Sequence, residues 1–380
     1  MSTRRANHEG NIRRRADGSW EARMTHVDPD SGQTRRVSFY GPTAKAVRKK
    51  MNDARDRIKC GAPVRDATRT VADWLAQWQS TTLAVSDRKE STRELYAMLS
   101  RKHLEPPPFG AITLDRLRPT DVEALILKLK GAGLADSTVR SVYTVLRAAL
   151  DGAVRDRLLA HNAAAVVKRP GIERVEARHV DELDATALLR AAEGLRYRPV
   201  LVLIAATGLR RGEALALRWE HVNFDDKTLR VEATLGRVGG QLVSSVPKTK
   251  RSRRTVPISP AIVTLLKAQK AQQAAERLHA GDQWTDSGLV FTTEFGTPVD
   301  PRNILRTVQT AAAKAGIGRV GVHTLRHSAA VGWLESGVHI KAVADLLGHS
   351  SIAVTGDVYG HTSDQAARAA IEGRSGALGL

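Results

Sequence analysis

The sequence has little cysteine, few aromatic residues and no long apolar run. Cys60 is its one cysteine, which excludes an internal disulfide and favours a reducing, cytoplasmic setting. No apolar stretch reaches the ~18 residues that span a bilayer, and none follows the first arginines, so we expect neither a membrane helix nor a signal peptide. Aromatic residues are only 4% of the chain, which disfavours binding by stacking on single-stranded bases.

Positive charge is what the sequence has in excess. The 380 residues include 59 Lys and Arg against 40 Asp and Glu, a formal net charge of +19. Such an excess predicts a polyanionic partner, and we expect double-stranded DNA rather than a membrane, which would associate the protein with the nucleoid. A protein that neutralises about 6–10 phosphates loses roughly 10³–10⁵ in affinity between about 50 and 200 mM salt, so binding should depend steeply on salt.

The pattern of elements predicts a multidomain protein, mainly α with small β-sheets. Residues 1–62 are interpreted as a small sheet-plus-helix module. Residues 18–27 and 34–40 are expected to be strands, and Thr43 is placed to cap the following helix. So small a module has little core, so we interpret it as an arm that contacts DNA; a solvated basic extension is the alternative.

Residues 68–165 are predicted to form an all-α, core-binding type of domain. Apolar residues near its start recur at helical spacing and predict a buried face: Val71, Trp74, Leu75 and Trp78. Capping-box spacings that begin at Ser91 and Thr120 predict two further helix starts.

Residues 166–180 are charged and contain Pro170 and Gly171, which indicates a linker. Residues 181–380 are predicted to form an α+β domain that carries the chemistry. Its expected elements are helices over 183–206, 260–278, 302–315, 324–336, 340–348 and 365–372, and strands over 228–235, 241–246 and 254–258.

Basic side chains in all three regions are candidates for contact with DNA phosphates; a solvated charge is the alternative for each. The candidates are Arg35, Arg36, Arg140, Arg147, Lys250 and Arg251. The run from Lys250 to Arg254 is expected to be a solvated part of a hairpin or a phosphate contact.

Two motifs of the last domain hold arginines in defined local settings. In TGLRRGE, Gly208 permits a sharp turn before Arg210, and Glu213 is placed to orient the Arg210 guanidinium. A held guanidinium matches two phosphate oxygens. In HTLRH, the spacing puts His323 and Arg326 on one face of a helix.

Three further motifs supply the remaining groups needed to attack a phosphodiester. Lys248, at an expected hairpin tip, can protonate a leaving oxygen, although Lys250 is a rival. His349 follows Gly348, which ends a helix. Tyr359 is surrounded by small and polar residues, so it should be accessible, and a phenolate can act as a covalent nucleophile.

Together these motifs resemble the tyrosine recombinase (phage integrase) family, of the arm-binding integrase type. That family has an arginine in TGLRxGE, a hairpin lysine, HxxR, a histidine in LGH and a later tyrosine, and this chain has all five in that order. The resemblance implies the roles: Tyr359 forms a 3′-phosphotyrosyl bond, the two arginines hold the non-bridging oxygens, the two histidines add hydrogen bonds, and Lys248 protonates the departing 5′ oxygen.

The resemblance also implies an enzyme that integrates and excises a phage or mobile element at DNA attachment sites. It would act as a homotetramer on DNA, assisted by a recombination directionality factor and a host DNA-bending protein. Bond energy is kept in the phosphotyrosine, so we expect no nucleotide cofactor. We expect no metal either, because His323 and His327 have no acidic ligand cluster and Arg326 would repel a cation.

Three other functions remain open at this point. The first is a DNA-binding regulator with the same fold and no chemistry. The second is a type IB topoisomerase or a hairpin telomere resolvase, which also attack with a tyrosine. The third is a metal hydrolase that uses the histidines.

Overall fold

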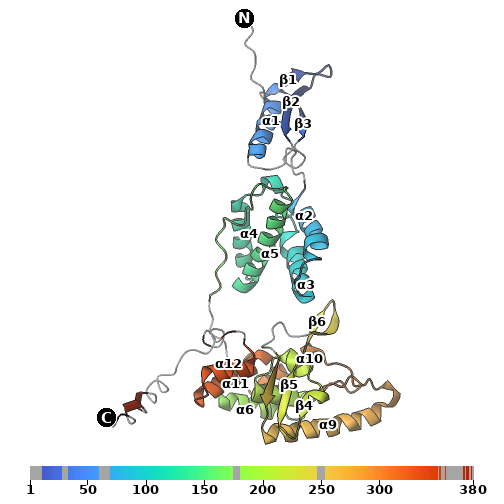
Figure 1. The fold of residues 1–380 in the computed structure, drawn as a ribbon, viewed down its shortest axis with the longest axis vertical. Helices are drawn as coiled ribbons and strands as arrows, with labels where there is room; N and C mark the ends of the chain where they lie inside the picture. The colour runs from blue at the N-terminus through green and yellow to red at the C-terminus, as the bar shows by residue number, and fades with distance from the viewer. Residues whose placement is uncertain are drawn as a thin grey trace. The chain divides into compact units, whose positions relative to one another are not determined.

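The computed structural model (Figure 1) describes residues 11–27, 33–59, 69–173, 180–245 and 253–349, and also 351, 356, 371, 372, 374, 375 and 378. The chain divides into two compact units, Met1–Arg174 and Val175–Leu380. This division falls inside the segment for which a linker is predicted. The expected fold class, a multidomain and mainly α protein with small antiparallel sheets, is confirmed.

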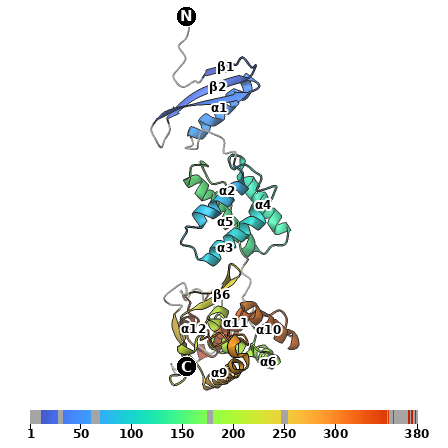
Figure 2. The ribbon, with the colours of Figure 1, turned by 90° about the vertical axis from the view of Figure 1, so that its right-hand side faces the viewer.

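The first part of the first unit is a three-stranded antiparallel sheet with one helix packed on it (Figure 2). Its elements are β1 (Asn11–Arg14), β2 (Trp20–Val27), β3 (Thr34–Gly41) and α1 (Ala44–Lys59). The side chain of Thr43 accepts a hydrogen bond from the backbone N–H of Ala46 at 3.1 Å, so the predicted cap is present. A small core closes this layer, formed by Ala22, Met24, Val47, Met51 and Ala54.

The rest of the first unit is helical and has a separate core. Its α-helices are α2 (Val71–Trp78), α3 (Glu90–Leu99), α4 (Pro119–Gly131) and α5 (Asp136–Arg155), with the shorter η1 (Gln79–Leu83), η2 (Ser100–Leu104) and η3 (Leu114–Arg116). The predicted buried face of α2 is confirmed. Trp74 is fully buried and its indole N–H donates to the Ala149 carbonyl at 2.8 Å, as a buried tryptophan requires.

The two predicted capping boxes are each wrong by two residues. α3 already begins at Glu90, so Ser91 lies inside its first turn. α4 begins at Pro119, whose fixed φ suits a first helical position, and the Asp121 carboxylate accepts from the Arg118 N–H at 2.8 Å. In each case a residue N-terminal to the expected cap already has helical geometry.

The second unit contains seven α-helices and five strands in its described residues. The helices are α6 (Glu182–Ala191), α7 (Arg198–Thr207), α8 (Arg211–Leu215), α9 (Pro260–Ala280), α10 (Pro301–Lys314), α11 (Val322–Glu335) and α12 (Ile340–Leu347), with the short η4 (Trp219–His221) and η6 (Gly281–Gln283). The strands are β4 (Val222–Asn223), β5 (Thr228–Val231), β6 (Thr234–Val238), β7 (Gln241–Ser245) and β8 (Arg254–Pro257). One sheet has the order β4-β5-β8, and β6 pairs with β7 as a separate hairpin.

Two predicted elements of this unit are split. The helix expected over 183–206 is two helices, because Gly194 takes a left-handed φ of 78° between them and Pro199 favours a new helix start. The strand expected over 228–235 is also divided, with β5 in the antiparallel sheet β4-β5-β8 and β6 in the hairpin. The helix expected over 365–372 lies largely outside the described residues.

The buried helix α7 positions the loop that carries Arg210. Four of its residues are completely buried: Val200, Leu201, Leu203 and Ile204. α7 packs against α11, and α11 packs against α12, so the ends of three helices meet in one region. None of the helices in the described parts of the chain is long and apolar enough to cross a membrane.

Candidate active site

Arg210 is held by the turn between α7 and α8. Gly208 ends α7 in the left-handed conformation, with φ 62°, and the chain then turns so that Arg210 precedes α8. Glu213 accepts hydrogen bonds from the Arg210 guanidinium at 2.8 Å and from the Arg210 backbone N–H at 3.0 Å. The side chain of Glu213 is 3% exposed and that of Arg210 is 36% exposed, so the carboxylate fixes a guanidinium that solvent can reach.

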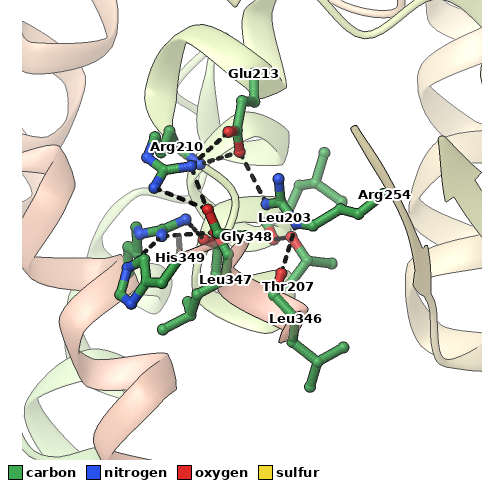
Figure 3. Close-up of polar contacts among 11 residues, drawn as sticks. Leu203, Thr207, Arg210, Glu213, Arg254, Leu346, Leu347, Gly348 and His349 are labelled. Carbon is green, nitrogen blue, oxygen red and sulfur yellow. Dashed lines mark hydrogen bonds and ion pairs between the residues drawn. The ribbon is translucent and has the colours of Figure 1, made fainter. Parts of the chain in front are cut away.

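Arg210 belongs to a cluster, here called the Arg210 cluster, that also contains Glu213, Arg254, Arg326 and His349. Arg254 was not predicted from the sequence as one of its members. It begins β8, and its guanidinium contacts the Glu213 carboxylate at 2.9 Å and the Leu346 carbonyl at 2.6 Å (Figure 3). The expected solvated charge is therefore wrong for this residue. The available signal was strand parity: Arg254 has the same parity as the buried Val256, whereas Thr255 is exposed.

Arg326 connects the ends of two helices. Its guanidinium donates to the carbonyl oxygen of Gly208 at 2.5 Å and to that of Leu347 at 2.8 Å, which joins the end of α7 to the end of α12. Arg326 itself is only 4% exposed. In this structure, Arg326 therefore holds the framework of the cluster, whereas Arg210 presents the accessible positive charge.

His349 is placed by the left-handed Gly348 that ends α12. Arg326 lies 2.9 Å from Nε2 of His349, and a guanidinium can only donate, so Nε2 accepts and the ring proton is on Nδ1. Partial burial lowers the pKa of His349 to about 4, with further lowering by the charges of Arg326, Arg210 and Arg254. His349 is therefore neutral near pH 7 and carries a hydrogen-bond donor at Nδ1.

Glu213 stays ionised between two guanidinium groups. Burial alone would raise the pKa of its carboxyl, but the hydrogen bond and charge of Arg254, together with Arg210, outweigh burial and lower that pKa. The result is one carboxylate shared by two arginines, with Arg326 beside them. The cluster keeps net positive charge, which suits an anion with several oxygens.

His323 lies beside the cluster on the first turn of α11 and is exposed. Partial loss of solvent lowers the pKa of His323, and the charges of Arg326, Arg211 and Arg210 lower it further. It lines a pocket of about 430 Å³ together with Arg210 and Arg211. The structure thus brings His323 to the same site as Arg210.

Several predicted site residues lie outside the described residues, namely Lys248, Lys250, Arg251 and Tyr359. Four predicted DNA contacts belong to the first unit. Arg35 and Arg36 are exposed on β3, and Arg147 is exposed on α5. Arg140 is half-buried and donates to the Pro170 carbonyl at 2.8 Å, so part of its guanidinium holds the chain that follows the helical domain.

The chemistry available to the cluster is anion binding and electrostatic stabilisation. Its charged groups are three guanidiniums and one carboxylate, with neutral histidines at their edge. In the part of the chain that the structure describes, no group of three or more His, Cys, Asp or Glu is arranged to hold a metal ion. Such a cluster can stabilise the charge that develops on a phosphate under attack.

Comparison with known proteins gives consistent relatives. The model of the phage integrase family matches residues 176–366. A tyrosine recombinase XerC-like protein of Caldanaerobacter subterraneus subsp. tengcongensis is 29% identical over 361 residues, covering 90% of this chain and 92% of the relative. An integrase of Streptomyces ambofaciens is 30% identical over 332 residues, covering 84% of this chain and 83% of the relative.

Two solved structures share the fold. The Tn1549 transposon integrase in complex with transposon right end DNA has a TM-score of 0.65 and 19% identity, covering 80% of this chain and 98% of that one. A lambda integrase tetramer bound to a Holliday junction has a TM-score of 0.58 and 18% identity, covering 95% of this chain and 98% of that one.

Proposed function

The chain belongs to the phage integrase family and is a tyrosine-type site-specific recombinase, and we propose that Tyr359 is its nucleophile within the Arg210 cluster. The phenolate oxygen of Tyr359 attacks a DNA phosphorus, and the bond from phosphorus to the 5′ oxygen breaks. The products are a 3′-phosphotyrosyl linkage and a 5′-hydroxyl, whose proton comes from Lys248. A 5′-hydroxyl of a second duplex then attacks the linkage and releases the tyrosine.

Arg210 is the group best placed to hold the non-bridging oxygens. It is the most accessible of the three clustered guanidiniums, and Glu213 fixes its orientation before DNA arrives. A donor that is held in advance stabilises transition-state charge without reorganising. Arg326 adds positive charge and holds the carbonyls around which the cluster is built, and Nδ1–H of His349 supplies a further donor.

The proposed function also implies the binding partners of the protein. We infer double-stranded DNA attachment sites as the substrate, because the chain carries a net charge of +19 and its relatives in known structures include an integrase in complex with transposon end DNA. A homotetramer is proposed by analogy with the lambda integrase tetramer on a Holliday junction. A recombination directionality factor and a host DNA-bending protein remain proposed accessory partners.

The domain roles are proposals of the same kind. Residues 1–62 would bind arm-type DNA through Arg35 and Arg36. Residues 68–165 would bind the core site, with Arg147 exposed for phosphate contact and Arg140 partly engaged by Pro170. Residues 166–180 would link them to the catalytic residues 181–380.

The single observation that supports the proposal best is the convergence of Arg210, Arg326 and His349. Arg210 precedes Arg326 and His349 by more than a hundred residues in the sequence, and the three side chains meet around the carbonyls of Gly208 and Leu347. A basic surface that only bound DNA would not need a buried carboxylate to orient one guanidinium, nor a neutral histidine against another. This arrangement favours chemistry over simple regulation.

The test is capture of the covalent intermediate. Sequencing the DNA that flanks the gene should identify a repeated core, and a duplex of this core, nicked so that the freed 5′ fragment is lost, should trap the protein. We expect a denaturation-resistant protein–DNA adduct with the natural chain and none with Tyr359→Phe, which should still bind the duplex.

The regulator, the topoisomerase and the metal hydrolase each predict a different outcome in adduct, plasmid or EDTA assays. Binding without adduct would indicate a regulator. Adduct formation and relaxation on plasmids that lack the core would indicate a topoisomerase. Adduct formation by Tyr359→Phe would mean that another side chain is the nucleophile, and loss of activity in EDTA would indicate a metal-dependent hydrolase.

A further inference from the structure

The pocket of about 430 Å³ extends beyond the Arg210 cluster to residues that the proposed chemistry does not use. One wall is the start of α8, with Arg211 and the preceding Arg210, and a second is β6 with Arg237. The start of α10, with Asp300 and Arg302, completes it. Helices α8 and α10 both pack against β6, so these walls belong to one framework within the second unit.

The charges that line this pocket are unbalanced. Among the residues that the structure describes, four arginines line it against one carboxylate, that of Asp300. This carboxylate is already occupied, because it accepts from the Arg302 backbone N–H at 2.8 Å and forms an ion pair with Arg237. The Arg302 N–H and the charge of Arg237 lower the pKa of Asp300, so it remains ionised and still leaves an excess of positive charge.

Among the described residues, Arg211 is the arginine of this set that is half-buried and forms no ion pair with a carboxylate. It is half-buried, and its guanidinium donates to the neutral carbonyl oxygen of Pro301 at 3.3 Å. Burial lowers the pKa of Arg211, with Asp300 opposing that change. An arginine remains charged even so, and a partly desolvated charge binds an opposite charge more strongly than a solvated one.

The walls of the pocket are held at a fixed distance by Gly212. A Cβ at this position would lie 2.7 Å from the carbonyl oxygen of Leu235, closer than real Cβ atoms approach. Only glycine lets the backbone of α8 approach β6 so closely. Arg211 and Arg237 therefore leave neighbouring backbone segments on two adjoining walls of the pocket.

We propose that this pocket binds a second phosphate of the DNA strand, adjacent to the phosphate under attack, with Arg211, Arg237 and Arg302 as its ligands. The inference rests on the proposed function, because Arg210 and His323 border both sites. Two phosphates held side by side fix the register and direction of the strand, so the pocket would place the correct phosphate opposite the nucleophile.

The test measures DNA affinity against salt in the full chain carrying Tyr359→Phe, so that no chemistry interferes. The probe is the duplex of the repeated core. Arg211→Gln should lower the slope of log Kd against log salt by about 1, the change for one lost phosphate contact. Arg211→Lys keeps the charge and should keep most of the slope.

Arg277→Gln is the matched control. Arg277 is an exposed arginine on α9, which lies on the other side of this unit from β6 in both views (Figures 1 and 2). The slope of log Kd against log salt for Arg277→Gln should equal that of the parent chain. Melting temperatures of all variants show whether a loss of affinity reflects unfolding instead.

Asp300→Asn tests the sign of the effect. Asparagine still caps α10, but the substitution removes the negative charge and releases Arg237. Binding should tighten by about two- to fivefold, the size of a partly exposed charge interaction. Weaker binding by both Arg211→Gln and Asp300→Asn would mean that the pocket matters only for structure, and would overturn the proposal.

A scan with uncharged methylphosphonates locates the contact. Neutralising one phosphate beside the cleavage point should weaken DNA binding by the parent chain. The same neutralisation should not weaken binding by Arg211→Gln any further. An unchanged slope, coupling at no phosphate, or coupling at the scissile phosphate itself would each overturn the inference. Failure of the proposed function is seen separately, as absence of the covalent adduct with the natural chain.

Discussion

The guanidinium of Arg254 lies 2.9 Å from the carboxylate of Glu213, and the two side chains are only 7% and 3% exposed. The same carboxylate holds Arg210, so one buried anion aligns two cations. Arg254 also donates to the Leu346 carbonyl near the end of α12. This pair therefore links β8, α8 and α12 around the cluster.

Loss of Arg254 should destabilise the protein strongly. Removing one partner of a buried ion pair leaves an incompletely compensated charge, so Arg254→Gln should lower the free energy of unfolding by about 3–5 kcal/mol. Arg230→Gln is the control, since Arg230 is a 58% exposed arginine of β5 that pairs with Glu232. The control should change stability by less than ~1 kcal/mol in urea titrations. Equal effects of the two substitutions would contradict the role given to Arg254.

Arg210→Lys should lose activity although it keeps the charge. Lysine has no planar fork, so it cannot hold Glu213 and two phosphate oxygens together. The rate of adduct formation at saturating DNA should fall by roughly 10²–10³. Single-turnover gels with the nicked core duplex measure this rate. A lysine variant within a factor of about two of the parent would show that only charge at this position matters.

The proton donor can be assigned with a modified leaving group. Lys248→Ala should slow adduct formation by about 10²–10⁴, the usual contribution of general acid catalysis. A duplex with sulfur in place of the bridging 5′ oxygen needs no proton on the leaving group, so it should restore the rate. Lys250→Ala is the matched comparison. It should slow adduct formation less than Lys248→Ala does, and the sulfur duplex should not restore its rate. If the sulfur duplex restored the rate of Lys250→Ala alone, Lys250 rather than Lys248 would be the proton donor.

His349 should make stability depend on pH. Its pKa in the folded chain is about 4, whereas that of an unfolded histidine is about 6.5, so the unfolded state binds more protons between these values. Stability from this group is present above about pH 6.5 and is lost as pH falls towards 4. His349→Gln should therefore flatten the dependence of unfolding free energy on pH in this window. An unchanged slope would mean that His349 is not held neutral.

Local patterns predicted much of the fold. The periodic apolar face of α2 and the cap at Thr43 were confirmed because each depends on residues a few positions apart. The prediction failed where a single residue altered the local backbone. Gly194 divides the helix expected over 183–206, and Pro119 starts α4 before the predicted capping box. A helix boundary depends on which of several neighbouring residues, such as a cap, a proline or a glycine, determines the local backbone. The residue pattern alone does not show which of them prevails.

By itself, the sequence determined the family and the identity of the groups, because motifs such as TGLRRGE and HTLRH are contiguous and specific. Only the tertiary structure decided which charges meet. Arg254 looked like one more arginine in a basic run, yet it is buried against Glu213, and Arg326 is more enclosed than Arg210. The physical reason is that burial and hydrogen bonding are set by chain segments distant in sequence, whose packing fixes where each charge can be neutralised.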